Sequence, residues 1–251
     1  MGTSAMQTEP INLSRWVIFD ADNTLWDVES LYNNARQTFC TYVADLLSRQ
    51  SMERKLVEGN TDTLQRHRDI QLQKTHGYSS ARFARSFEDT LSFLLPFSSP
   101  DEMRHVRNLA MNVFEMEAVT YDGLESAIDA LSQHYRLAII TAGERWVQER
   151  RLEAFKFRER FSRIDIVDHK SPDVFDAFCQ REEVDRDRSW VVGDSLRSDI
   201  LPAIQVGLRA VHFEAPNWTY ESTHKPDGIL SARTMQDVVA LVSVGPLEQT
   251  A

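Results

Sequence analysis

Short apolar runs recur along this chain, and four of them lead directly into polar residues. The runs are too short for helices, and buried strands of α/β proteins have this length and composition. They are Val17–Phe19, Leu137–Ile140, Ile164–Val167 and Trp190–Val192. Helical patterns separate them, which predicts parallel strands joined by crossover helices. Ala210–Phe213 predicts a last core strand, and Gly228–Val244 predicts a short strand and a helix that complete the layer.

The pattern between the first two runs is different, because helix follows helix there. Helices are predicted over Leu25–Leu47, Glu53–Gly59, Leu64–Thr75, Ala81–Leu95 and Asp101–Val119. No convincing strand interrupts this block before Leu137. A chain of 251 residues can hold one large or two modest domains. We therefore expect an all-helical segment inserted into an α/β domain.

Two carboxylates, Asp20 and Asp22, follow the first apolar run. A strand would present both on one face, because residues i and i+2 point the same way. Acids held this close resist joint ionisation, so a cation or a shared proton is expected between them. Taken alone, the segment also suits a strand followed by an Asx-rich turn.

Polar groups also end the next two runs. Thr141-Ala142-Gly143 suits a loop whose hydroxyl and backbone N–H groups hold an anion, although many strands end in threonine and glycine. Lys170 follows the third run, at a position where a single lysine is usually solvated. Each of these signals is ambiguous by itself.

The fourth run opens into Gly193-Asp194-Ser195, and Asp199 follows four residues later. Gly193 allows a tight exit from the strand, and the two aspartates add carboxylates at its end. Asp199 also suits the N-cap of a helix over Ile200–Val206. Ligands of parallel α/β sheets bind at the carboxyl ends of the strands, so all four polar segments are expected to act on one ligand.

The four segments in this order resemble the motifs of the haloacid dehalogenase-like hydrolase superfamily. Its pattern D-x-D-x-T, then S/T, then K, then G-D-x-x-x-(x)-D is matched in turn by Asp20/Asp22/Thr24, Thr141, Lys170 and Gly193/Asp194/Asp199. The resemblance spans about residues 16–213. Relatives usually continue the lysine motif as K-P-x-P, whereas this chain reads Lys170-Ser171-Pro172-Asp173, with the proline displaced by one position.

The resemblance implies an α/β fold with a Rossmann-like parallel sheet core and an inserted all-helical cap domain of the C1 type. Residues 1–28 and 120–251 would form the core domain, and residues 29–119 would form the cap. The interval from Thr141 to Lys170 holds only one predicted helix and one strand, so a second cap has no room there. The helical cap would then be the main element of substrate specificity.

The resemblance further implies a phosphatase that works through an aspartyl-phosphate. Asp20 would be the nucleophile, and Asp22 the general acid and base. Mg²⁺ would be held by Asp20, the backbone carbonyl of Asp22, and Asp194. Asp22 favours phosphate esters, because relatives that cleave carbon–halogen bonds lack an acid at this position. A phosphotransferase or mutase would share all these residues, and a non-catalytic scaffold on the same fold is the other alternative.

The remaining motif residues would serve the phosphoryl group. Its oxygens would be held by Thr141, Lys170 and the backbone around Ala21, Ala142 and Gly143. Thr141 and Lys170 complete the catalytic set, and Asp199 would orient Lys170 or a metal-bound water, with Ser195 in support.

Substrate selection would fall to the helical segment, in which Gly77-Tyr78-Ser79-Ser80 breaks two predicted helices. Tyr78, Arg82 and Arg85 lie in or just after this turn and are candidates for contact with an anionic substrate. The same residues also suit a solvated helix start.

Composition narrows the class of partner. A formal net charge of −10 without a basic stripe argues against nucleic acid. Cys40 and Cys179 predict small buried hydrophobes in a reducing compartment, and His169 is the one histidine expected near the site, as a bystander. No apolar stretch approaches a membrane span, and Met1 to Pro10 lacks a signal-peptide pattern. We expect a cytoplasmic monomer or homodimer that acts on a small phosphorylated metabolite, with no membrane or nucleic-acid partner.

Overall fold

The computed structural model describes residues 14–48, 54–215 and 225–243. These residues divide into two compact units. The α/β unit comprises the described residues within Met1–Trp26, Thr120–Ala142 and Phe155–Ala251. The helical unit comprises those within Asp27–Val119 and Gly143–Ala154.

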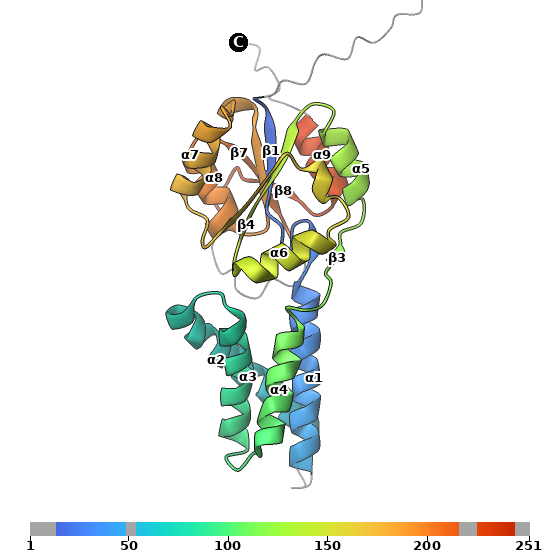
Figure 1. Ribbon diagram of the computed structural model, residues 1–251, viewed down its shortest axis with the longest axis vertical. Helices are drawn as coiled ribbons and strands as arrows, with labels where there is room; N and C mark the ends of the chain where they lie inside the picture. Colours follow the sequence, from blue (N-terminus) through green and yellow to red (C-terminus); the bar gives the residue numbers. More distant parts are fainter. Residues whose placement is uncertain (1–13, 49–53, 216–224, 244–251) are drawn as a thin grey trace, which may run out of the picture. The chain divides into compact units, whose positions relative to one another are not determined.

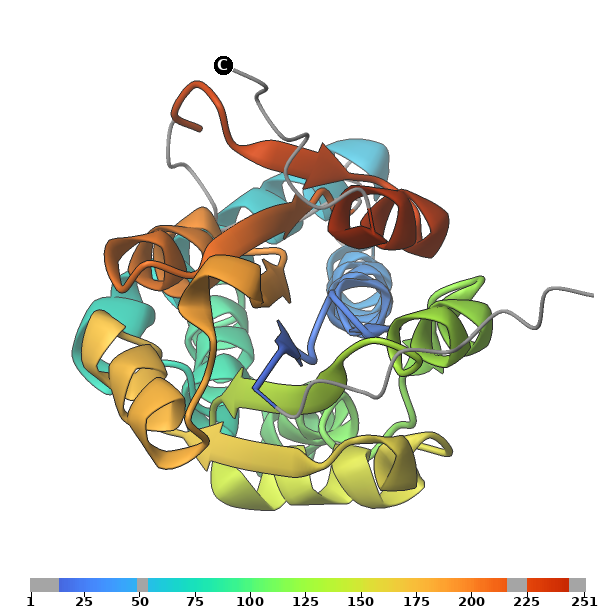
Figure 2. The same cartoon turned by 90° about the horizontal axis from the view of Figure 1, so that it is seen from above.

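The α/β unit is built on a parallel sheet of six strands (Figures 1 and 2). In spatial order the strands are β5 (Arg163–Val167), β4 (Arg136–Ala142), β1 (Trp16–Phe19), β6 (Trp190–Gly193), β7 (Arg209–Phe213) and β8 (Leu230–Ala232). Every pair of neighbours is parallel. The first strand is therefore central, with the chain continuing to β4 on one side and to β6 on the other. This arrangement confirms the predicted fold class and creates a switch point at the end of β1.

Both faces of the sheet are covered by helices, which explains why its central strands β1, β4 and β6 are mostly apolar and buried. Helices α7 (Pro172–Arg181) and α8 (Leu201–Gln205) cover one face, and α5 (Leu124–Leu131) and α9 (Met235–Ser243) cover the other (Figure 1). Alternate residues of a strand point to opposite faces. Trp16 and Ile18 accordingly pack in one buried cluster with residues of α7 and α8.

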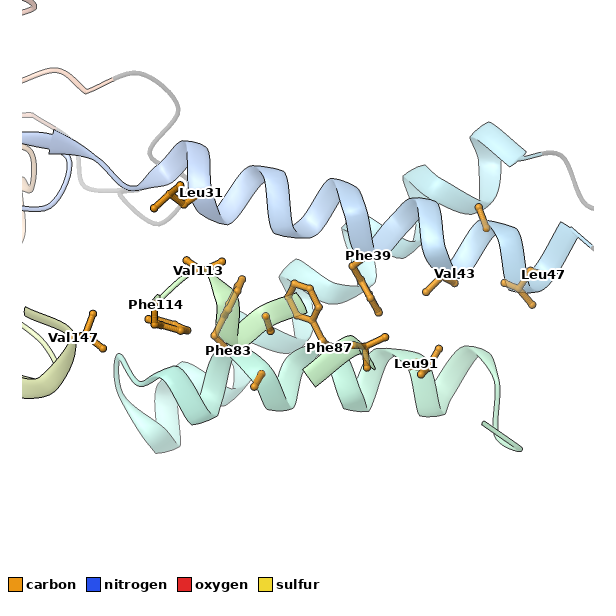
Figure 3. Packing of buried hydrophobic residues seen from close by; sticks show 14 residues of the cluster. Leu31, Phe39, Val43, Leu47, Phe83, Phe87, Leu91, Val113, Phe114 and Val147 are labelled. Atoms are coloured by element: carbon orange, nitrogen blue, oxygen red, sulfur yellow. The ribbon is translucent and has the colours of Figure 1, made fainter. Parts of the chain in front are cut away.

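The helical unit contains α1 (Glu29–Leu47), α2 (Arg54–His76), α3 (Ser80–Leu94), α4 (Pro100–Asn112) and α6 (Arg145–Ala154). Phenylalanines from α1 and α3 meet in its core, with Phe39 and Phe87 4.6 Å apart between ring centroids (Figure 3). Two helices begin at side-chain caps, which satisfy backbone N–H groups that have no partner within the helix. Ser79 accepts from the Arg82 N–H, and Ser99 and Glu102 form a reciprocal capping box.

Helix α6 packs within the helical unit, although its residues fall in the range 120–251 that the sequence assigns to the core. Val147 is buried in the cluster of Figure 3. The Ser80 backbone N–H donates to Glu144 at 3.1 Å, and Arg150 donates to the backbone carbonyl of Glu115 at 3.1 Å. The predicted domain limits do not anticipate these contacts, and the limits stay a prediction.

Two predicted features of the helical block are wrong. A single helix, α2, runs through the region where two helices were expected. Gly59, at the expected break, lies within this helix, and a Cβ there would contact no other atom. Two short strands, β2 (Trp26–Asp27) and β3 (Val119–Thr120), pair with each other at the ends of the block, where no strand was expected. Strands of two residues are too short to repeat the two-residue alternation of a strand, so no pattern indicates them.

Two simpler expectations can be checked directly. Cys40 and Cys179 are both buried free thiols, as predicted. None of the helices in the described ranges is long and apolar enough to cross a membrane.

Candidate active site

The site is centred on Asp20, the first residue after the central strand β1. Its backbone N–H donates to the carbonyl of Val192 at 2.9 Å, which continues the pairing of β1 with β6 by one residue. The Asp20 side chain is buried, and Thr24 lies at hydrogen-bond distance from its Oδ2, at 3.4 Å. A carboxylate is thereby fixed at the switch point of the sheet.

A tight turn follows Asp20 and folds the chain back on itself. Leu25 donates its N–H to the carbonyl of Ala21 at 2.8 Å, and Asn23 donates to the carbonyl of Trp26 at 2.7 Å. Asn23 has φ of 60°, in the left-handed region that asparagine tolerates better than most residues. The turn brings Trp26 beside Asp22, and the indole Nε1–H donates to Asp22 Oδ1 at 2.7 Å.

Lys170 reaches the same place from the loop after β5. Its ammonium forms ion pairs with Asp20 Oδ1 and Asp199 Oδ1, and its side chain is 4% exposed. The displaced proline, Pro172, is the first residue of α7, where its missing N–H breaks no helical hydrogen bond. The departure from K-P-x-P therefore leaves Lys170 within the cluster.

Asp199 lies in a π-helical turn, Leu196–Ile200, after β6. It accepts from the Ser195 backbone N–H at 3.1 Å, and a Cβ on Gly193 would overlap its carboxylate. Gly193 therefore provides space for Asp199, besides the tight exit from the strand. The alternative assignment of Asp199 as the N-cap of the following helix is wrong, because the N-cap residue of α8 is Ile200 and no side chain caps it. Ser195 caps the π-helical turn itself and accepts from the Ser198 N–H.

Three buried carboxylates meet in this cluster. Oxygen atoms of Asp20, Asp194 and Asp199 all lie within 4.8 Å of one another. Asp194 Oδ2 is buried and accepts no hydrogen bond from any described residue. Buried carboxylates in excess over the Lys170 ammonium are costly unless a cation joins them. Oxygen donors of this kind fit a hard divalent cation such as Mg²⁺.

The crowding of these acids changes their proton affinities. Burial raises the pKa of Asp20 to about 7, with Lys170 opposing the rise and Asp199 adding to it. Burial, followed by repulsion from Asp20 and Asp199, raises the pKa of Asp194 well above its ordinary value. Burial disfavours the charged form of Lys170, but Asp199 and Asp20 outweigh it and raise the pKa of the ammonium. The ammonium therefore stays charged at neutral pH.

A family model for haloacid dehalogenase-like hydrolases matches residues 15–207, which include every residue of the cluster. The chain belongs to this hydrolase family. Pyrimidine 5'-nucleotidase YjjG of Escherichia coli is 28% identical over 232 residues, covering 86% of this chain and 97% of YjjG.

Two solved structures show the same fold. A haloacid dehalogenase-like family hydrolase from Xanthomonas campestris matches with a TM-score of 0.73 at 19% identity, over 92% of this chain and 95% of that one. The putative hydrolase YfnB from Bacillus subtilis, bound to magnesium, matches with a TM-score of 0.62 at 16% identity, over 92% and 99% of the two chains.

The predicted phosphate loop of this hydrolase begins at the end of β4, the strand beside β1. Thr141 is fully buried, and Ala142 ends the strand. Gly143 has φ of 142°, a value that side chains rarely allow, and a Cβ there would lie 3.1 Å from Gln148 Nε2. A glycine is therefore required two residues after the threonine. The phosphate contacts of these residues and of Ala21 stay predictions.

The sequence missed two residues that contact the site of the hydrolase. Trp26 holds the carboxylate of Asp22, as described above. His212, on β7, has its Nε2 2.9 Å from the backbone carbonyl of Asp194, so this nitrogen is the donor. The expectation that His169 is the one histidine near the site is therefore wrong. No motif indicates either residue, because both contacts depend on how strands and turns meet in space.

The three candidate specificity residues lie in the helical unit in different environments. Tyr78 is 51% exposed, and Arg85 is 64% exposed and pairs with Asp89 one turn along α3. Arg82 is buried and pairs with the fully buried Asp69 at 2.8 Å. Arg82 is thus not part of a solvated helix start. Contact of the three with substrate stays a prediction.

Proposed function

We propose that this hydrolase is a Mg²⁺-dependent phosphatase that cleaves small phosphate monoesters through a phosphorylated Asp20. The observation that carries the proposal is the excess of buried carboxylates around Asp20 at the switch point of the sheet. Phosphoryl transfer depends mostly on positioning and charge neutralisation. A buried nucleophile, a buried ammonium and a cation site supply both.

The proposed metal ligands are Asp20, the backbone carbonyl of Asp22, and Asp194. A bound Mg²⁺ would offset the negative charge of the phosphoryl oxygens and of the carboxylates. The unsatisfied Oδ2 of Asp194 supports this assignment, because a buried oxygen without a hydrogen bond is otherwise unfavourable.

The chemistry of the side chains follows in two steps. An oxygen of Asp20 attacks phosphorus, the bond to the leaving oxygen breaks, and Asp22 gives its proton to that oxygen. Water then attacks the phosphoaspartate, gives a proton to Asp22, and releases inorganic phosphate and the free Asp20 carboxylate. Lys170 neutralises charge on Asp20 and on the phosphoryl group in both steps. The Thr141 hydroxyl and neighbouring backbone N–H groups would hold the other phosphoryl oxygens.

Asp22 separates this proposal from dehalogenation, the reaction for which the family is named. A halide leaves as an anion and needs no proton, whereas an alkoxide or nucleoside oxygen does. A carboxylate held two residues after the nucleophile by a dedicated hydrogen bond is consistent with the need for a general acid. The similarity to a pyrimidine 5'-nucleotidase makes nucleoside monophosphates the first substrates to examine.

The test is an assay of the full chain for phosphate release from 4-nitrophenyl phosphate, a panel of nucleoside 5'-monophosphates and other phosphorylated metabolites. We expect release with Mg²⁺, its loss in EDTA, and recovery when Mg²⁺ is restored. A parallel assay for halide release from 2-haloacids should be negative. Halide release without phosphate release would overturn the proposal in favour of a dehalogenase.

A further inference from the structure

Trp26 is a buried residue that no motif of the site includes, yet its one polar atom contacts the site. The side chain is 2% exposed, and its Nε1–H donates to Asp22 Oδ1 at 2.7 Å. Asp22 itself is only partly buried. The partly exposed Asp22 carboxylate therefore accepts a hydrogen bond from a side chain of the core.

The indole ring belongs to a series of contacting aromatic rings that ends on β1, the strand that precedes the proposed nucleophile. Trp26 packs edge-on against Phe155 at 5.0 Å between centroids, and Phe155 lies 5.8 Å from Phe161. Phe161 in turn lies 6.1 Å from Phe19, the last residue of β1. Edge-to-face packing fixes ring orientation as well as position. The direction of the Nε1–H bond is thus set by the same core that sets Asp20.

The backbone of the turn adds a second constraint. The Trp26 carbonyl accepts from the Asn23 N–H at 2.7 Å, and the residue pairs with Asp22 through an isolated β-bridge. Main chain and side chain of Trp26 therefore both fix the segment that carries Asp22.

We propose that Trp26 is the positioning residue for the general acid. This inference rests on the proposed function, because it takes Asp22 as that acid. An indole N–H donates and never accepts, so it bonds to Oδ1 in both protonation states of Asp22. When Asp22 is protonated, Oδ1 is the carbonyl oxygen and Oδ2 carries the proton. In the first step the P–O bond breaks while the proton moves from Oδ2 to the leaving oxygen, and the indole proton stays on nitrogen.

Leaving groups that differ in their need for a proton isolate this role. An alkyl phosphate needs the acid, whereas 2,4-dinitrophenyl phosphate departs without it. The constant kcat/KM reports steps up to departure of the leaving group, so later hydrolysis of phosphoaspartate does not enter it. For Trp26→Phe we expect kcat/KM to fall about 10-fold or more on the alkyl phosphate and by less than about 2-fold on the dinitrophenyl ester.

Trp16→Phe is the matched control. Trp16 is also a fully buried tryptophan of the α/β unit, but its Nε1–H bonds to none of the described residues. Its substitution should change kcat/KM by the same factor for both esters. Replacing Trp26 with 3-benzothienylalanine, which keeps the ring shape and removes only the N–H, provides a second variant should the phenylalanine variant fold poorly.

An equal loss on both esters in the Trp26 variants, or no loss on either, would overturn the inference while leaving the phosphatase assignment intact. The same outcome follows if Trp16→Phe reproduces the selective loss. A wild-type protein inactive on every phosphate ester would instead overturn the proposed function. The two failures are therefore distinguishable.

Discussion

The α/β unit and the helical unit both bury carboxylates, but they balance the charge differently. In the helical unit, the buried Glu29 pairs with Arg36 at 3.0 Å. The buried Asp69 likewise pairs with Arg82 at 2.8 Å. In the α/β unit, three buried carboxylates gather around the one ammonium of Lys170, which contacts two of them.

The difference separates a structural use of buried charge from a functional one. A balanced buried pair adds little net stability, but breaking it leaves an uncompensated charge inside the protein. An unbalanced cluster costs stability in the native state, and such costs concentrate at functional sites. Substitutions that remove a carboxylate should therefore have opposite effects on the stability of the two units.

The largest expected effect is on activity. Asp20→Asn should lower kcat for phosphate release by about 10⁴-fold or more, because an amide is a poor nucleophile in this reaction. The melting temperature in EDTA near neutral pH should stay equal or rise, since the change removes one of three crowded charges. Phosphate release and circular dichroism melts check the two expectations. A variant that retains about a tenth of the wild-type kcat on any ester would show that Asp20 is not the nucleophile.

The next effect is on stability in the helical unit. Asp69→Asn should destabilise the protein by about 3–5 kcal/mol, because Arg82 keeps its charge in a buried site without its partner. Urea unfolding followed by circular dichroism measures the change. Asp89→Asn is a control, since Asp89 pairs on the surface with Arg85 and should cost less than about 1 kcal/mol. Equal losses for the two variants would contradict the claim that the Asp69–Arg82 pair balances charge inside the protein.

A smaller effect concerns pH. The folded protein holds protons on Asp20 and Asp194 more tightly than the unfolded chain, because both pKa values are raised. Stability from this source is fully present below the unfolded pKa of 3.8 and is lost as pH rises to about 7. In EDTA, the melting temperature should therefore have a component that falls across this window.

Mg²⁺ should reverse that fall, since it replaces the protons. The asparagine variants of Asp20 and Asp194 should each weaken the pH dependence relative to wild type. A difference curve, wild type minus variant, isolates the component from other titrating groups. A difference in melting temperature that rises with pH in EDTA would show that the negative charge of the cluster is already balanced without a metal ion.

The smallest effect concerns substrate choice. Arg85→Ala should change stability by less than about 0.5 kcal/mol, because its ion pair with Asp89 is largely exposed. If the turn contacts substrate, the order of kcat/KM across the metabolite panel should change while 4-nitrophenyl phosphate is unaffected. An unchanged order in both Tyr78→Ala and Arg85→Ala would show that this turn does not select the substrate.

The sequence predicted the sheet and the members of the cluster for one physical reason. Strands β1, β5 and β6 come from short apolar runs that polar residues follow, so Asp20, Lys170 and Asp194 could be assigned to one edge. Parallel pairing then brings them together without further information. The local sequence patterns were sufficient because the site lies at the carboxyl ends of the strands.

The features that the sequence did not predict depend on contacts that leave no repeating hydrophobic pattern in the sequence. Strands β2 and β3 are two residues long, and α2 continues where the pattern suggested a break. Trp26 and His212 contact the site through one polar atom each, on segments that otherwise resemble core. Arg82 resembled a solvated residue because its partner, Asp69, lies on a different helix.

The most direct test of the central claim is a calorimetric titration of the metal-free protein with Mg²⁺. An unbalanced carboxylate cluster should bind one ion per chain, Asp194→Asn should abolish that binding, and Asp89→Asn should leave it unchanged. Mg²⁺ binding of equal affinity in wild type and Asp194→Asn, or no binding in wild type, would contradict the claim that the buried charge of the α/β unit is a cation site.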